Sequence, residues 1–326
     1  MPAPSSRAGF PVYDVATFTL NPSLDHWSEA EEVVPVRKVR TVEERFDPGG
    51  GGINVARVVR ELGGRPLAVY ATGGFAGDAF AALVEQHHFD HRAVRISGDT
   101  RISHTVYDRA NRQEYRFVPE GPRLTEQERE AFLAEIEGCE ATYAVLSGSL
   151  PAHSGPDLAA EVVRRMRKTG ARCVADLSGE ALRAALDVGV HLVKPNLREL
   201  EALVGRDLPT RDDRRGACRD IVDSGGADTV ALTLGAEGAM LATADGVLEL
   251  TNPAVEVRSA VGAGDSFVAA MVVALARGRP TDEAFSYGVA AGAAAAMTPA
   301  TELCRRADVE ELFERIVRKG PPGRRR

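Results

Sequence analysis

The sequence predicts an α/β fold: a mostly parallel sheet with helices on both faces, and a small β-sheet lid over one end. Two observations predict it. Short apolar, strand-like runs alternate with helical patterns along most of the 326 residues, which implies βαβ units. Two stretches, residues 21–47 and 99–122, instead contain alternating apolar and polar residues, a pattern typical of strands with one solvated face. We expect these two stretches to form the lid.

Each element follows from its local pattern. Residues 12–20 predict a buried first strand, and residues 31–46 predict a strand with one solvated face. Residues 102–108 and 113–118 predict a hairpin, because a polar turn joins them. Further strands are expected at 67–71, 142–146, 172–176, 192–193 and 229–234. Helices are expected at 53–62, 78–86, 125–137, 156–168, 197–204, 210–224 and 264–277, with another core helix near 288–297.

Composition limits the class of protein. The hydrophobic content of 44% is ordinary for a soluble protein. The net charge of −7 argues against a protein that binds nucleic acid or a membrane surface. Residues 1–11 lack the apolar core of a secretory signal, and the apolar stretches are too short to span a bilayer. The four cysteines are scattered, so neither a zinc site nor a disulfide framework is indicated. We expect a cytoplasmic protein with no nucleic-acid or membrane partner, a disordered tail at 1–11 and a basic tail at 319–326.

Residues 260–267 (AVGAGDSF) predict a helix that begins through two glycines and has Asp265 in its first turn. First-turn N–H groups have no partner within the helix and attract anions. Glycines allow a phosphate to approach the backbone closely. A carboxylate base beside an anion site suits phosphoryl transfer to a hydroxyl. For this segment alone, an ordinary helix start softened by glycine remains the alternative.

A second glycine-rich segment, residues 48–57 (PGGGGINVAR), leads directly into a predicted helix. Its backbone can approach a ligand closely, and Asn54 offers an amide to a hydroxyl group. Asp25 follows the first strand, where its carboxylate can accept two sugar hydroxyls. The alternatives are a flexible linker for the glycine run and an Asx-turn for Asp25.

Three further clusters follow predicted strands, at 146–151, 193–200 and 232–239. The first contains small hydroxyl groups, which suit an anionic group or an ordinary turn. In the second, Asn196 and Glu199 lie one helical turn apart, which suits either Mg²⁺ held through water or a helix cap. The third is a glycine loop between strands, suited to nucleotide phosphates or to a plain hairpin. Ligands of open α/β sheets bind at such strand ends.

Other patterns carry less information. The histidines and the aspartate of residues 87–91 follow a helix, and a solvated surface explains them better than a metal site does. The sequence contains neither a P-loop nor a dinucleotide-binding fingerprint. Lysine is rare among the 40 basic residues, so its positions are informative. Lys168 and Lys319 fall near predicted helix C-termini, whereas Lys38 and Lys194 need another explanation.

Taken together, these segments resemble the pfkB (ribokinase-like) family of sugar kinases. The resemblance spans residues 13–316 and rests on the order and approximate spacing of the motifs at 21–25, 49–54, 147–151, 194–199, 235–238 and 262–265. The glycine run, together with residues 115–118 and 178–182, is most similar to the branch of minor, type B, ATP-dependent 6-phosphofructokinases. The resemblance implies a ribokinase-like three-layer sandwich whose α/β kinase domain comprises residues 12–20, 48–98 and 123–318.

The resemblance further implies a kinase that transfers the γ-phosphoryl group of MgATP to the 1-hydroxyl of fructose 6-phosphate. Asp265 matches the catalytic base. The N–H groups of Ala263, Gly264 and Asp265, in the turn that begins at Gly262, match the anion hole. The residues that match acceptor contacts are Asp25, Gly50, Gly51 and Asn54 for the sugar, and Lys38, Arg101 and Ser149 for its phosphate. The residues that match nucleotide contacts are Lys194, Asn196, Thr233, Gly235 and Gly238, with Asn196 and Glu199 near Mg²⁺.

Several alternatives stay open. The acceptor is tagatose 6-phosphate or fructose 1-phosphate in a second hypothesis, and in a third the chain is a non-catalytic sugar-phosphate sensor. Residues 298–302 differ from the polar, glycine-containing loop that borders the adenine and a monovalent-cation site in relatives, so dependence on potassium stays open. The resemblance also implies a homodimer joined through the lid, in which Arg101 can arrive from the partner.

Overall fold

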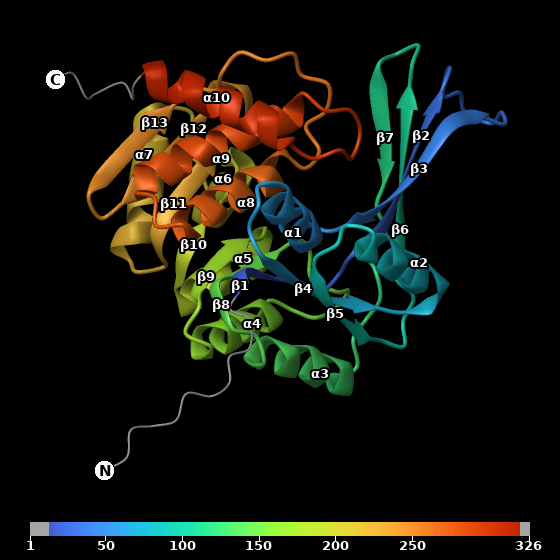
Figure 1. Cartoon of the computed structure of the whole chain (residues 1–326), viewed down its shortest axis with the longest axis horizontal. Helices are drawn as coiled ribbons and strands as arrows, with labels where there is room; N and C mark the ends of the chain where they lie inside the picture. The colour runs from blue at the N-terminus through green and yellow to red at the C-terminus, as the bar shows by residue number, and fades with distance from the viewer. Residues whose placement is uncertain (1–12, 320–326) are drawn as a thin grey trace.

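The computed structural model describes residues 13–319 (Figure 1), and the expected tails before and after them lie outside these residues. Nine strands of the described chain form one sheet in the order β13-β12-β11-β10-β9-β8-β1-β4-β5. Strands β11 to β5 of this order are parallel, and β12 and β13 extend the edge antiparallel. Their bounds are β1 Tyr13–Thr19, β4 Pro66–Thr72, β5 Asp90–Arg95, β8 Ala141–Ser147, β9 Arg172–Asp176, β10 Val190–Val193, β11 Ala227–Thr233, β12 Ala239–Thr243 and β13 Gly246–Leu250.

Helices cover both faces of this sheet and make three layers (Figure 1). One face packs against α3 (Glu126–Glu137), α4 (Asp157–Lys168), α5 (Gly179–Val188), α6 (Leu197–Val204) and α7 (Arg211–Asp223). The other face packs against α1 (Gly51–Glu61), α2 (Gly74–Glu85), α8 (Ala263–Ala276), α9 (Thr281–Ala296) and α10 (Arg306–Lys319). The predicted three-layer α/β class is therefore confirmed.

The central strands are buried on both faces, which explains their nearly continuous apolar runs. In β8, Ala144 and Leu146 pack into the core on the side of α3 to α7, whereas Tyr143 and Val145 pack into the core on the side of α8 and α9. Because side chains alternate along a strand, each strand contributes to two hydrophobic cores. This packing fixes the strand ends, and with them the loops of the site described below.

The four remaining strands form a separate sheet in the order β3-β2-β6-β7, which projects from one side of the α/β body (Figure 1). Its strands are β2 (Ser23–Ala30), β3 (Thr41–Gly49), β6 (Arg101–Asp108) and β7 (Gln113–Phe117). The hairpin expected at 102–108 and 113–118 is present as the antiparallel pair β6 and β7, and β2 pairs antiparallel with β3, whereas β2 and β6 pair in parallel. Both strands leave the body at the same edge, where Ser23 pairs with Arg101, so they run outward together.

Several element predictions differ from the structure. The strand expected at 31–46 begins only at Thr41; residues 31–40 form a loop in which Val36 has a φ of 67°. The sequence patterns did not predict β5, β13 or α5. Strand β5 lies at the sheet edge and has few apolar residues, so its pattern resembles a loop. His91, expected in a polar connection, lies in β5 and contacts the Tyr70 hydroxyl at 3.0 Å.

Two chain-wide features bear on the class of protein. Within residues 13–319, no helix combines the length and the apolar character that crossing a membrane requires. All four cysteines are free and buried. Burial raises the pKa of the thiols of Cys139 and Cys173 to about 11, so neither is present as a reactive thiolate near neutral pH.

Candidate active site

The carboxyl ends of neighbouring parallel strands meet at one edge of the sheet and supply many of the predicted site residues. Strand order reverses at β1, which lies between β8 and β4, and such a switch point is where open α/β sheets bind ligands. Ser147 ends β8, Asp176 ends β9 and Lys194 follows β10. The glycine run and the start of α8 reach the same edge, because Gly51 lies against Ser147 and Gly264 lies against Lys194.

The first turn of α8 leaves backbone N–H groups available to an anion. Gly262 is the N-cap residue and has a φ of 73°, in the left-handed region that favours glycine. The N–H of Ala263 reaches the carbonyl oxygen of Ala260 at 3.5 Å. Within the described residues, the N–H groups of Gly264 and Asp265 have no backbone acceptor. The tight turn before the helix therefore leaves two free N–H groups, rather than the three that were expected.

Asp265 lies at this helix start with its carboxyl group surrounded by polar groups from other elements. Desolvation, followed by the charge of Asp176, raises the pKa of Asp265 to about 7. The side-chain N–H of Asn54 donates to Asp265 Oδ2 at 2.8 Å, and this bond and the charge of Lys194 oppose the shift. A carboxyl group that titrates near neutral pH is well suited to accept a proton from a hydroxyl.

A buried ion pair lies beside Asp265. Lys194 Nζ is 3.0 Å from Asp176 Oδ1, and the two side chains are only 7% and 13% exposed. Burial lowers the pKa of Lys194, but the charges of Asp176, Glu199 and Asp265 outweigh this effect and the net shift is upward. Lys194 is therefore held as a cation, as phosphate binding requires. Asp176 was not among the predicted site residues, although an aspartate at the end of a predicted strand was an available signal.

The glycine run is tightly packed, so the flexible-linker alternative is wrong. A Cβ on Gly49 would lie 2.1 Å from Asp25 Oδ2, and one on Gly51 would lie 2.1 Å from Ser147 Oγ. Gly50 is the N-cap residue of α1 and has a φ of 113°. The absence of side chains thus allows the start of α1 to approach both the lid and the sheet edge.

Asp25 lies inside strand β2, opposite Asp47 of β3, so the Asx-turn alternative is wrong. Ser23 Oγ donates to Asp25 Oδ1. Burial raises the pKa of Asp25, while this hydrogen bond and the charge of Arg101 oppose the shift. The charge of Asp25 also raises the pKa of Asp265, so the lid base lies near the start of α8.

The structure brings together two of the three predicted phosphate-binding residues. Arg101 Nη2 donates to Ser149 Oγ at 3.1 Å. Arg101 also donates to the carbonyl oxygens of Asn21, Pro22 and Pro119, so four of its five N–H groups are used. This arginine therefore ties the lid base to its own chain, whereas the resemblance allowed it to arrive from a partner.

Lys38 does not join this group. It lies in the exposed loop that connects β2 to β3. Strand β2 starts at the lid base with Ser23 and ends at Ala30, which places the loop at the far end of the lid, roughly 23 Å away at the usual rise per residue. The prediction that Lys38 contacts the phosphate is not supported within one chain, because the lid extends away from the body.

A cavity of about 700 Å³ adjoins the start of α8 on the side of β11 and β12. Its lining includes the polar residues Lys194, Asn196 and Thr233, together with Gly264. The remaining lining includes Gly235, Gly238, Val255, Phe267, Val289 and Ala293. A Cβ on Gly238 would lie 2.0 Å from the carbonyl oxygen of Leu250, so that glycine is required by strand packing. The size, the apolar lining and the position of Lys194 beside Gly264 fit a nucleotide with its phosphates toward α8.

Asn196 and Glu199 form a helix cap, which was the alternative to a magnesium site. Asn196 Oδ1 accepts from the Glu199 N–H at 3.0 Å, and Glu199 Oε2 accepts from the Asn196 N–H at 2.8 Å. Within residues 13–319, no group of three His, Cys, Asp or Glu side chains could hold a metal ion directly. Burial nevertheless raises the pKa of Glu199, so a nearby cation would be favourable. These residues fit Mg²⁺ held through water.

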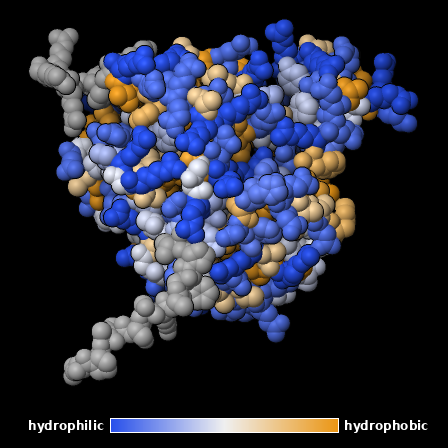
Figure 2. All heavy atoms as spheres, in the orientation of Figure 1, coloured by the Kyte–Doolittle hydropathy of each residue, from blue (hydrophilic) through white to orange (hydrophobic). Residues whose placement is uncertain are grey.

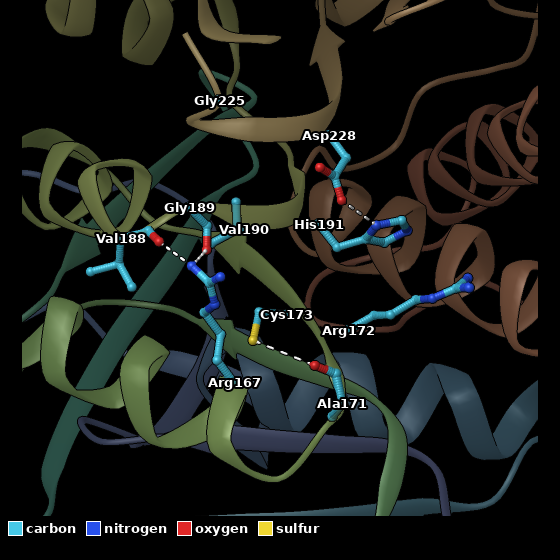
Figure 3. Close-up of a pocket in the computed structure, with 10 residues that line it drawn as sticks. All are labelled: Arg167, Ala171, Arg172, Cys173, Val188, Gly189, Val190, His191, Gly225 and Asp228. Carbon is cyan, nitrogen blue, oxygen red and sulfur yellow. Dashed lines mark hydrogen bonds and ion pairs between the residues drawn. The ribbon is translucent and has the colours of Figure 1, made fainter.

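A second cavity, of about 510 Å³, lies at the opposite edge of the sheet (Figure 3). Arg167 points at the carbonyl oxygens of Val188 and Gly189, where α5 ends, and His191 Nδ1 lies 3.0 Å from Asp228 Oδ2. Cations beside a helix C-terminus are stabilised by its dipole and its unpaired carbonyl groups. Helix capping explains Arg167, whereas His191 and Asp228 pair between the neighbouring strands β10 and β11. None of the predicted site residues lines this cavity.

Comparisons with known proteins identify the family of the chain. Residues 19–307 match the model of the pfkB family carbohydrate kinases. The chain is 39% identical over 308 residues to the ATP-dependent 6-phosphofructokinase isozyme 2 of Escherichia coli, covering 93% of this chain and 99% of that protein. The crystal structure of Escherichia coli phosphofructokinase-2 in complex with potassium superimposes with a TM-score of 0.90 at 37% identity, covering 94% of this chain and 100% of that one.

A more distant structure shows that the fold is ribokinase-like. Arabidopsis thaliana ribokinase, solved with ribose and ATP, has a TM-score of 0.74 at 20% identity, covering 93% of this chain and 99% of that one. The family match covers most of this chain. The chain therefore belongs to the pfkB family of carbohydrate kinases.

Proposed function

We propose that this chain is an ATP-dependent sugar-phosphate kinase, specifically a 6-phosphofructokinase that phosphorylates fructose 6-phosphate at its 1-hydroxyl. The observation that supports this most is the position of Asp265, whose pKa is raised to about 7, beside two free N–H groups at the start of α8. The names of the similar proteins supply the choice of acceptor. A non-catalytic sensor would need no carboxyl group tuned in this way.

In the proposed reaction, the acceptor hydroxyl oxygen attacks the γ-phosphorus of ATP, its proton passes to Asp265, and the bond to the leaving ADP breaks. The N–H groups of Gly264 and Asp265 donate to the oxygens of the transferred phosphoryl group. Lys194 pairs with the phosphates, and Mg²⁺ held near Asn196 and Glu199 through water would neutralise further negative charge. These charge contacts offset the repulsion between two phosphorylated substrates.

Acceptor and nucleotide bind on opposite sides of Asp265 in this proposal. Asp25 and Asn54 accept and donate hydrogen bonds to sugar hydroxyls, with Gly50 and Gly51 allowing close approach of the ring. Arg101 and Ser149 lie at the base of the lid and would contact the acceptor's own phosphate. The nucleotide would lie in the 700 Å³ cavity against Thr233, Gly235 and Gly238. Asn54 bridges the two sides through its bond to Asp265.

We further propose that the segments 21–47 and 99–122 act as a lid and join two chains in a homodimer. Apolar side chains exposed on the described lid include Val36, Val42, Phe46, Phe117 and Val118, and exposed apolar groups of this kind favour a partner surface. Figure 2 shows apolar atoms among polar ones at the upper right, where the lid strands lie. Sedimentation equilibrium would measure the assembly; a monomer at micromolar concentration would contradict the homodimer.

A coupled assay of ADP release tests the proposed function. Fructose 6-phosphate, tagatose 6-phosphate, fructose 1-phosphate, fructose and tagatose are each supplied with MgATP. We expect the highest kcat/KM with fructose 6-phosphate. A higher value with another sugar phosphate would correct the acceptor alone. Absence of turnover with all five, in protein whose Trp27 fluorescence still responds to fructose 6-phosphate, would favour the sensor.

The acceptor's phosphate should be recognised by Arg101 and Ser149. We expect Arg101→Ala to raise KM for fructose 6-phosphate by roughly 10–100-fold, which corresponds to the loss of one charge-assisted hydrogen bond. Ser149→Ala should raise the same KM by a smaller factor. The KM for ATP should change little. Arg112→Ala, in the exposed turn of the same lid hairpin, is the matched control. Equal increases in both KM values would instead indicate that Arg101 only holds the lid base.

A further inference from the structure

Arg57 lies one turn after Asn54 on α1, and its side chain is only 10% exposed. Its Nη1 donates to Asn54 Oδ1 at 3.4 Å. The other end of the Asn54 amide, Nδ2, donates to Asp265 Oδ2 at 2.8 Å. Asn54 therefore links a buried guanidinium group on one side to the proposed base on the other.

The chemistry of these groups determines which way the amide points. A guanidinium group donates hydrogen bonds and cannot accept them, so Arg57 can only face the carbonyl oxygen of Asn54. The NH₂ group must then face Asp265. An amide turned by 180° would place N–H groups against Arg57 and an oxygen against the carboxylate, and both contacts would be repulsive. Arg57 thus selects one of two orientations that the Asn54 side chain could otherwise adopt.

Arg57 is itself held in place by the lid. Its Nη2 lies 3.7 Å from Asp47 Oδ1 of β3, and Asp47 also accepts from Arg45 and from the Thr301 hydroxyl. We infer that Arg57 is a positioning residue: it fixes the Asn54 amide so that its NH₂ group keeps Asp265 ionised and ready to accept the substrate proton. This inference rests on the proposed role of Asp265 as the base.

The consequence concerns the protonation of Asp265. An N–H donor stabilises the carboxylate form, whereas an amide oxygen in the same place would stabilise the protonated form. The charged groups that face Asp265 from neighbouring elements are Asp176, Lys194 and Asp25, and those near Arg57 are Asp47, Arg45, Asp25 and His87. Burial, and then the charge of Arg57, lower the pKa of His87 to about 4, so this histidine stays neutral above pH 6.

The test compares two replacements of Arg57 by the pH dependence of kcat/KM for fructose 6-phosphate between pH 5.5 and 9. Arg57→Met removes the donors and should move the acid limb up by about one pH unit, the value of one hydrogen bond to a charged group. Activity at pH 9 should stay within about threefold of the wild type. Arg57→Lys keeps a group that donates hydrogen bonds and cannot accept them, so the acid limb should stay at its wild-type pH. Arg60→Met, exposed on the same helix, should change nothing.

A double-mutant cycle separates orientation of the amide from simple loss of a positive charge. In an Asn54→Ala background, Arg57→Met should no longer move the limb, because there is no amide to orient. If Arg57→Met moved the acid limb equally far in that background, the inference would be overturned. It would also be overturned if Arg57→Met alone lowered kcat/KM by the same factor at every pH and left the limb in place. The ¹³C chemical shift of the Asp265 carboxyl group, followed against pH, reports the pKa of Asp265 without any turnover. The signal is assigned by its loss in Asp265→Asn. The effect of Arg57 on this pKa can therefore be tested even if the proposed function is wrong.

Discussion

Asp265→Asn should lower kcat by roughly 10²–10⁴-fold, the usual contribution of a positioned general base. An asparagine has nearly the same shape and can still accept the hydrogen bond from Asn54, but it cannot take up the hydroxyl proton. Binding of ATP, measured by calorimetry, should be nearly unchanged, because the nucleotide cavity and Lys194 are intact. Turnover within threefold of the wild type would show that Asp265 is not the base.

The same variant should be more stable than the wild type at pH 8. The folded-state pKa of Asp265 is raised from 3.8 to about 7, so the contribution of this group to stability is greatest below pH 3.8 and is lost as the pH rises through 7. At pH 8 the ionised carboxylate therefore costs stability, by at most about 4 kcal/mol for a shift of this size. Urea unfolding should show a higher free energy of unfolding for Asp265→Asn than for the wild type at pH 8, and a smaller difference at pH 5. Asp245→Asn, in the exposed turn before β13, should show neither effect.

Asp176→Asn should destabilise the fold by about 3 kcal/mol, the lower end of the range for a broken buried ion pair. The substitution leaves Lys194 buried without the carboxylate that lies 3.0 Å away. Glu199 and Asp265 also act on Lys194, which limits the loss. The free energy of unfolding in urea at pH 8 measures it. The acid limb of kcat/KM should also move to lower pH, because the charge of Asp176 raises the pKa of Asp265.

Asp228→Asn is the matched control for this prediction. Asp228 pairs with His191 at a similar distance of 3.0 Å, but at the opposite edge of the sheet and with its own side chain 76% exposed. Exposed ion pairs contribute about 0–1 kcal/mol, so Asp228→Asn should lower the free energy of unfolding by at most about 1 kcal/mol. If both variants lost the same free energy of unfolding, burial would not make the pair of Lys194 and Asp176 more important for stability than an exposed pair.

Local sequence patterns were sufficient for most of the fold and for the location of the site. The apolar runs predicted β1, β4, β8, β9 and β11 because strands buried on both faces have few polar residues. Two glycines followed by an aspartate located the start of α8, because the backbone requirement at Gly262 is local. Strand β5 was missed for the opposite reason, since an edge strand contains the polar residues of a loop.

The partners of each side chain were decided only by the tertiary structure. Asn54 and Asp265 are 211 positions apart, and no local pattern states that one donates to the other. No local pattern states that Lys194 pairs with Asp176 either. Lys38 lies at the far end of the lid, and only the tertiary structure shows that this loop is distant from the site. The sequence by itself determined the elements and the motifs at their ends, because these depend on neighbours within a few residues. Which donors, acceptors and charges meet depended on how the packed cores align the strand ends.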